Sequence, residues 1–315
     1  MPNGPKTKSR PFFASFIRRP ETRRKTTAMA DDPKWPRAST LISHEVSDIA
    51  IIDIPAFKTA ITKTGADKTP KAIREALQGY STFSYSASLD LGRITIEDLG
   101  EIEDPDENEQ KTIARLSALR KKLVIALGGD NSITYAAALG LVGEDLTNAR
   151  LITLDAHHDL RDGVSNGSPI RRIIDAGFNP ANIFQIGIND FSNSPEYAIY
   201  AKSAGVNVIS RTTIAEIGIA RACELALADA KGPIFVDIDV DVCDRAFVPA
   251  CPAAAPGGIS AFELRIAARI LASHPAVRGI DITEIDATSD SKDQRTIRLG
   301  ALLVLEIATG FQQRS

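Results

Sequence analysis

The chain has 315 residues, 43% of them hydrophobic, with a formal net charge of −3. This is enough for one large α/β domain with a buried core. The near-neutral charge argues against nucleic acid as a partner, and no apolar run is long enough to span a membrane. The sparse cysteines, Cys223, Cys243 and Cys251, lack metal-ligand spacing and indicate reduced thiols, so we expect a cytoplasmic protein.

Residues 1–40 differ in composition from the rest of the chain. They are basic, rich in Pro, Ser and Thr, and lack sustained hydrophobic periodicity. We predict a disordered tail here, followed by a single domain at 41–315. The alternative is an organelle transit peptide, because such peptides are rich in Arg and Ser and poor in acids.

Beyond the tail, short apolar runs alternate with longer amphipathic segments. The predicted strands are 49–54, 93–99, 122–127, 150–155, 182–187, 206–210, 233–239 and 277–283. The predicted helices are 69–79, 110–122, 132–142, 168–177, 195–205, 213–232, 259–274 and 295–310. This alternation is typical of βαβ units. It predicts an α/β fold with three layers, α/β/α, around a mostly parallel sheet of about eight strands.

Acidic clusters follow four of these strands. They are GGDN after 122–127, DAHHD at 155–159, DIDVDVCD at 237–244 and TEIDATSD at 283–290. In such sheets the functional site lies beyond the carboxyl ends of the strands. We therefore expect the four clusters to meet on one rim.

In DAHHD, strand alternation places Asp155, His157 and Asp159 on one side of the chain. Two carboxylates and an imidazole are suitable ligands for a hard cation. His158 should point the other way and pack against the protein rather than bind metal.

In DIDVDVCD, the same alternation places Asp237, Asp239 and Asp241 on one face of a strand buried on both sides. Buried carboxylates without a partner are costly, and a bound cation removes that cost. Oxygen ligands with one imidazole suit Mn²⁺ best, and two carboxylate groups suggest two metals. A phosphate-binding role for GGDNS is weak, since it lacks the P-loop lysine and the third glycine of the dinucleotide motif.

Together these motifs resemble the ureohydrolase superfamily of arginases, agmatinases, guanidinobutyrases and formimidoylglutamases. GGDNS, DAHHD, DIDVDVCDRAFVPACPAAAPGG and DITEIDATSD stand in the family's order, and the resemblance covers about residues 48 to 310. It implies an arginase-like fold and a homo-oligomer, either a trimer or a hexamer. It also implies a small-molecule amidine or guanidine substrate.

The resemblance also assigns site residues. It implies two Mn²⁺ ions per chain, held by positions that match Asn131, Asp155, His157, Asp159, Asp239 and Asp241. The catalytic positions it implies are Asp159, which carries a proton, and Glu284, which binds the substrate's amidine or guanidinium group.

Several positions depart from the family's pattern. Asn131 replaces a metal-binding histidine, which predicts a weakened first site and leaves one metal per chain as an alternative. Asn166 replaces a proton-shuttling histidine that formimidoylglutamases also lack, and it is predicted to bind substrate. Arg161, with Arg171, is predicted to bind a substrate carboxylate, although Arg161 could instead pair with Asp159 or Asp162.

These features favour metal-dependent hydrolysis of a non-peptide C–N bond by a metal-activated hydroxide. The best match is formimidoylglutamase, which converts N-formimidoyl-L-glutamate to L-glutamate and formamide. The alternatives are a guanidine hydrolase that releases urea, like agmatinase or guanidinobutyrase, and a non-catalytic homologue.

Overall fold

The computed structural model describes residues 32–314, and its elements belong to the compact unit Trp35–Ser315. Most of the predicted tail at 1–40 lies outside the described residues and stays a prediction. The first described element is the 3₁₀ helix η1 (Ala38–Leu41), in which Ala38 and Leu41 are buried.

A nine-stranded sheet forms the centre of this unit, and all its strand pairs are parallel. The order is β1-β5-β2-β6-β11-β10-β7-β8-β9. The strands are β1 (Ile42–Ser43), β2 (Ile49–Ile54), β5 (Ile96–Glu101), β6 (Leu123–Gly128), β7 (Arg150–Leu154), β8 (Ile183–Ile186), β9 (Asn207–Ile209), β10 (Ile234–Asp239) and β11 (Val277–Thr283). A separate antiparallel pair consists of β3 (Phe83–Ser84) and β4 (Leu89–Asp90). The predicted fold class is confirmed.

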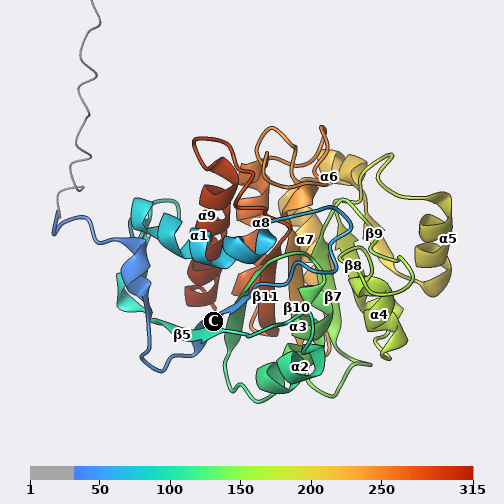
Figure 1. Cartoon of the computed structure of the whole chain (residues 1–315), viewed down its shortest axis with the longest axis horizontal. Coiled ribbons are helices and arrows are strands. Elements are labelled where there is room, and N and C mark those ends of the chain that lie inside the picture. Colours follow the sequence, from blue (N-terminus) through green and yellow to red (C-terminus); the bar gives the residue numbers. More distant parts are fainter. Residues whose placement is uncertain (1–31, 315) are drawn as a thin grey trace, which may run out of the picture. The chain divides into compact units, whose positions relative to one another are not determined.

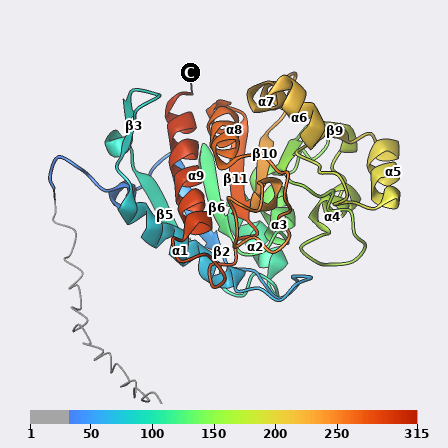
Figure 2. The same cartoon turned by 90° about the horizontal axis from the view of Figure 1, so that it is seen from above.

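Helices cover both faces of the sheet (Figures 1 and 2). One face carries α1 (Thr69–Ala76), α6 (Arg211–Ile217), α7 (Ile219–Leu227), α8 (Ala261–Ser273) and α9 (Arg295–Gln312). The other carries α2 (Glu109–Ser117), α3 (Ile133–Val142), α4 (Pro169–Asp175) and α5 (Pro195–Ala204). Further 3₁₀ turns are η2 (Ala66–Lys68), η3 (Leu77–Gly79), η4 (Leu91–Arg93), η5 (Pro180–Asn182) and η6 (Val240–Val242). Because both faces are covered, every residue of β2, β6, β7 and β10 is buried.

The single helix expected at 213–232 is wrong. The chain forms two helices, α6 and α7, that meet at Gly218. Gly218 has φ of +80°, which glycine adopts without a steric penalty but which ends an α-helix.

A close backbone contact fixes the loop after β6. A Cβ on Gly129 would lie 1.8 Å from the carbonyl oxygen of Ala56, so only glycine fits. The Asp130 backbone N–H donates to the same oxygen at 2.9 Å. The loop that carries Asn131 is therefore held against the chain that follows β2.

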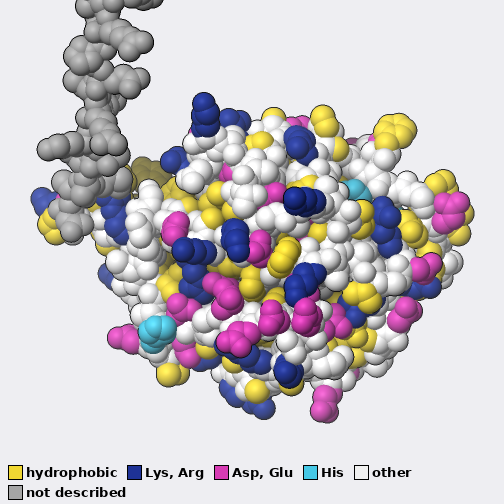
Figure 3. All heavy atoms as spheres, in the orientation of Figure 1, with side chains coloured by type: hydrophobic (Ala, Val, Ile, Leu, Met, Phe, Trp, Pro, Cys, Tyr) yellow, Lys and Arg dark blue, Asp and Glu magenta, His cyan; other side chains and the backbone are white. Residues whose placement is uncertain are grey.

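Among the described residues, no helix is long and apolar enough to cross a membrane. On the face shown in Figure 3, basic and acidic side chains are interspersed.

Candidate metal centre

The loop after β7 brings two carboxylates and an imidazole to the carboxyl edge of the sheet. Asp155 follows β7 directly and is fully buried. Its Oδ1 accepts a hydrogen bond of 2.6 Å from the His157 backbone N–H, which turns the chain. Asp159 has φ of +52°, a strained conformation that often occurs at functional sites. The loop is thus a tight turn rather than a continued strand.

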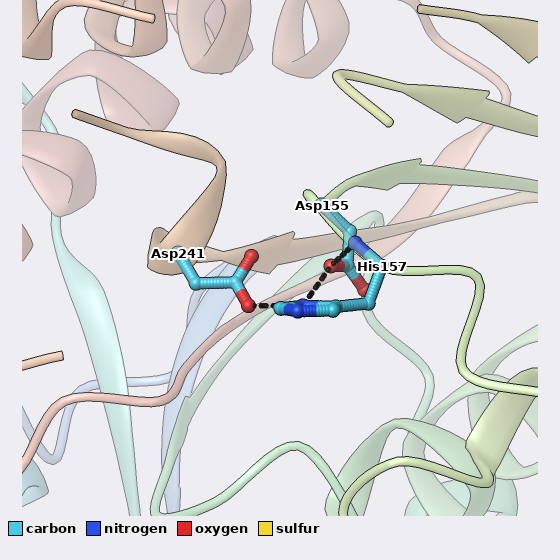
Figure 4. A group of neighbouring side chains, drawn as sticks. All are labelled: Asp155, His157 and Asp241. Carbon is cyan, nitrogen blue, oxygen red and sulfur yellow. Dashed lines mark hydrogen bonds and ion pairs between the residues drawn. The ribbon is translucent and has the colours of Figure 1, made fainter. Parts of the chain in front are cut away.

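The segment after β10 also differs from the sequence prediction. Asp237 and Asp239 lie on the strand, but Asp241 lies in η6, so the expectation that all three share one strand face is wrong. The Asp239 side chain accepts from the Asp241 backbone N–H at 2.8 Å, and this bond ends the extended chain. Asp241 nevertheless turns back to the site, where its Oδ2 lies 2.6 Å from His157 Nδ1 (Figure 4).

These side chains form two overlapping groups of possible ligands. One consists of Asp155, His157 and Asp241, and the other of Asp155, Asp159 and Asp239. Within each group the ligand atoms lie within 4.8 Å of one another. Asp155 belongs to both, and its buried Oδ2 has no hydrogen-bond partner among the described residues. An unpartnered carboxylate oxygen among other carboxylates fits a pair of hard cations that share Asp155.

The electrostatics of the metal-free cluster agree with this fit. Burial and then the charge of a neighbouring aspartate raise the pKa of Asp155 and of Asp239 well above the ordinary value. Burial raises the pKa of Asp159 to about 7. Burial alone would lower the pKa of His157, but the hydrogen bond and charge of Asp241 raise it to about 9. The cluster therefore resists carrying its full negative charge unless a cation compensates it.

Asn131, from the loop after β6, lies beside this cluster and is fully buried. Its Nδ2 donates to Asp159 Oδ2 at 2.7 Å. Its Oδ1 faces inward, 2.7 Å from the hydroxyl of Thr134 and 3.0 Å from that of Thr283. The amide nitrogen thus faces the cluster, and the role of Asn131 as a ligand stays a prediction.

Glu284 follows β11 and accepts hydrogen bonds from Asn131 and Asn166. It has φ of +62° and is 7% exposed. Its Oε1 accepts from the Asn131 backbone N–H and from Asn166 Nδ2, both at 2.8 Å. Burial raises the pKa of Glu284 to about 8. Both donors hold one oxygen, so the carboxyl group has a fixed orientation.

A cavity of about 500 Å³ opens over the cluster. Its lining includes His157, Asp159, Asp239, Asp241, Glu284, Asn166, Arg161, Asn193, Tyr197, Ala60, Ile61, Thr62 and Thr64. Glu284 and the possible ligands thus share one chamber with a cationic side chain, Arg161.

The structure separates the two arginines that were predicted to bind substrate. Arg161 lines the cavity and has no ion pair among the described residues, so the alternative pairing with Asp159 or Asp162 is not seen. Arg171 is not part of the lining. It lies 3.5 Å from a carboxylate oxygen of Asp162, and its guanidinium is 4.4 Å from the ring centroid of Tyr200.

The loop between β8 and α5 contributes residues that the sequence analysis missed. Asn193 accepts from the His158 backbone N–H at 2.8 Å and donates to the Ala156 carbonyl at 3.0 Å, so it braces the DAHHD loop. The sequence feature that could have identified Asn193 is its position after the carboxyl end of β8. His158 itself turns to Gln185, with Nδ1 2.7 Å from Oε1, which confirms that it points away from the cluster.

Comparisons with known proteins agree with this geometry. A model of the arginase family matches residues 47–310. Formimidoylglutamase of Bacillus subtilis is 35% identical over 292 residues, which cover 87% of this chain and 90% of that protein. The crystal structure of formimidoylglutamase from the same organism matches with a TM-score of 0.85 and 33% identity over 92% of this chain and 96% of that one. Trypanosoma cruzi formiminoglutamase, solved with Mn²⁺, has the same fold, with a TM-score of 0.83 at 21% identity over 89% of this chain and 100% of that one.

Proposed function

Because the chain belongs to the arginase family, whose members hydrolyse C–N bonds of linear amidines, we propose that it hydrolyses N-formimidoyl-L-glutamate to L-glutamate and formamide. The observation that carries this proposal is the cavity, whose lining includes the possible metal ligands, Glu284 and Arg161. A substrate with a cationic amidine and carboxylates is complementary to this lining, because the amidine can bind the Glu284 carboxylate and a carboxylate can bind the Arg161 guanidinium. A substrate with an amine in place of the carboxylates would face Arg161 with a like charge.

Two Mn²⁺ ions are the cofactor we propose. Asp155, His157 and Asp241 would hold one, and Asp155, Asp159 and Asp239 the other, with Asn131 completing a site. When bound, such ions lower the pKa of a coordinated water and supply a nucleophile at neutral pH.

The protein's own side chains would transfer the proton and bind the substrate. Asp159, which lines the cavity, would carry a proton during the reaction. Glu284 has Oε1 fixed by two donors, and its second oxygen is available to the amidinium. Asn166 has both ends engaged, since its Oδ1 also accepts from the Ile61 backbone N–H at 3.0 Å. Asn166 therefore holds Glu284 and shapes the substrate's entry.

The test is hydrolysis by Mn²⁺-loaded protein of N-formimidoyl-L-glutamate, agmatine, guanidinobutyrate and arginine, side by side. We expect the first to have the highest kcat/KM. We expect Arg161→Gln to raise the KM for N-formimidoyl-L-glutamate by roughly tenfold or more, because a charge-assisted contact is lost, and to change kcat less. The matched control is Arg171→Gln, which lies outside the cavity and should leave KM unchanged. Preference for agmatine, or equal effects of the two variants, would contradict the proposal.

We further propose a cytoplasmic trimer or hexamer with a disordered N-terminal tail. The cytoplasmic location is supported by three buried, unpaired cysteines. Light scattering on the full chain tests the assembly, and limited proteolysis tests whether cleavage is confined to the residues before Trp35, where the compact unit begins.

A further inference from the structure

The Asn131 side chain lies between two different environments. On its inner side are the hydroxyls of Thr134 and Thr283, which are both fully buried. On its outer side is a carboxylate oxygen of Asp159, 2.7 Å from Nδ2. A hydroxyl group can donate or accept, whereas a carboxylate can only accept. The two threonine hydroxyls can therefore bond to either end of the amide, whereas the Asp159 carboxylate accepts a hydrogen bond only from Nδ2. Asp159 thus determines which end of the amide faces the cluster.

The Thr134 hydroxyl has one proton but three acceptors within reach. They are Asn131 Oδ1 at 2.7 Å, Asp281 Oδ2 at 2.9 Å and Asp237 Oδ1 at 3.4 Å. A bond to an ionised carboxylate is stronger than one to an amide carbonyl. When Thr134 donates to Asp281, its oxygen is left as an acceptor, and the group that satisfies it is an N–H of Asn131.

The same holds for Thr283. Its hydroxyl lies 3.0 Å from Asn131 Oδ1 and 3.4 Å from the Ile238 carbonyl oxygen. When it donates to that carbonyl, its oxygen also needs a donor. A carboxamide nitrogen carries two N–H bonds. One could therefore donate to the Thr134 oxygen and the other to the Thr283 oxygen.

Turning the amide over exchanges Oδ1 and Nδ2 with almost no change of shape. In the turned orientation the Asn131 carbonyl would face Asp159, and two acceptors so close repel each other unless a cation lies between them. We infer that the Asn131 amide turns over when the cation binds, and that the Thr134 and Thr283 hydroxyls are positioning groups that satisfy both orientations. The inference rests on the proposed Mn²⁺ centre. It means that cation binding must first break the Asn131–Asp159 hydrogen bond.

The first experiment is Mn²⁺ titration, followed by the electron paramagnetic resonance signal of free Mn²⁺. Thr134→Val and Thr283→Val keep side-chain shape but remove one hydroxyl each, while Thr134→Ser and Thr283→Ser keep the hydroxyl. We expect each Val variant to bind one of two Mn²⁺ ions roughly tenfold more weakly, as for loss of one buried hydrogen bond, and each Ser variant to recover wild-type affinity. Thr283→Val serves alone if Thr134→Val does not fold, because Thr283 does not bond Asp237 or Asp281. Wild-type affinity in the Val variants would overturn the inference.

The second experiment uses Asn131→Asp, whose carboxylate cannot donate to Asp159. We expect a lower Tm than wild type without metal and a larger rise in Tm on adding Mn²⁺. An unchanged metal-free Tm, or a smaller Mn²⁺-induced rise, would overturn the inference. Neither experiment needs substrate, so Mn²⁺ binding without hydrolysis of N-formimidoyl-L-glutamate would overturn only the proposed function. Failure of the unmodified chain to bind Mn²⁺ would overturn both.

Discussion

Asp155→Asn should have opposite effects on the metal-free and the Mn²⁺-loaded protein. Asp155 is fully buried, its Oδ2 has no partner among the described residues, and burial and the charge of Asp159 raise its pKa. The amide keeps Oδ1 as the acceptor for the His157 N–H, and its new N–H groups can donate to the neighbouring carboxylates. Without metal, the substitution therefore replaces the unpartnered Oδ2 with a group that can donate to its neighbours, and it keeps the turn intact.

The size of the expected rise in Tm follows from the free-energy cost of leaving Oδ2 of Asp155 buried without a partner. A buried polar group without a partner costs about 1–3 kcal/mol. For a domain of this size, 1 kcal/mol shifts Tm by about 2–4 °C, so the metal-free variant should melt roughly 2–12 °C above wild type. A ligand at 100 times its Kd stabilises the folded protein by about 2.7 kcal/mol per site. The variant should lose much of that gain, because the carboxylate shared by both ligand groups is gone.

The assay is calorimetry with EDTA and again with saturating Mn²⁺, on wild type, Asp155→Asn and the control Asp162→Asn. Asp162 lies in the same loop, but its side chain is 90% exposed, so its substitution should change neither Tm. The reasoning is refuted if Asp155→Asn melts below wild type without metal and still gains the wild-type increment with Mn²⁺. Asp155 would then be a structural residue only.

Two further predictions concern pH and packing. In the folded, metal-free protein the pKa values of Asp159 (about 7) and Glu284 (about 8) exceed their ordinary values of 3.8 and 4.5. The stability that these two carboxyl groups contribute is therefore complete below about pH 4 and is lost as the pH rises through 7 and 8. Urea unfolding in EDTA should accordingly give a lower free energy of unfolding at pH 8.5 than at pH 5, and equal values would contradict this. Gly129→Ala should destabilise the protein by about 1–3 kcal/mol or more, because its Cβ would overlap the Ala56 carbonyl oxygen. The control, Gly79→Ala, meets nothing within 4 Å and should be nearly neutral in thermal unfolding.

The sequence predicted the sheet well because burial leaves a strong pattern. Each of the eight predicted strands occurs near its predicted position, and four of them, β2, β6, β7 and β10, are buried at every residue. The missed strand, β1, has only two residues, too few to show alternation, and is held by pairing with β5. The break at Gly218 was missed because a positive φ at glycine leaves no trace in the hydrophobic pattern.

The site residues were predictable as types and in their order along the chain, but not in their contacts. Arg161 and Arg171 are equally basic in the sequence. Only the fold shows that the first faces the cavity while the second pairs with Asp162 and stacks on Tyr200. The same limit applies to Asn131, whose bonding depends on hydroxyls from two other elements.

The positions of Asp237 and Asp239 show why parity alone misplaces a ligand. Both residues point to the same face of β10, but they lie two residues apart, about 6.6 Å along the strand. That distance is much longer than any metal–oxygen bond, so only Asp239 reaches the rim. Asp237 lies deeper, beside Asp281 of β11, and both are fully buried. The depth of an acid along its strand, and not only its face, therefore separates a possible ligand from the buried carboxyl pair beneath the site.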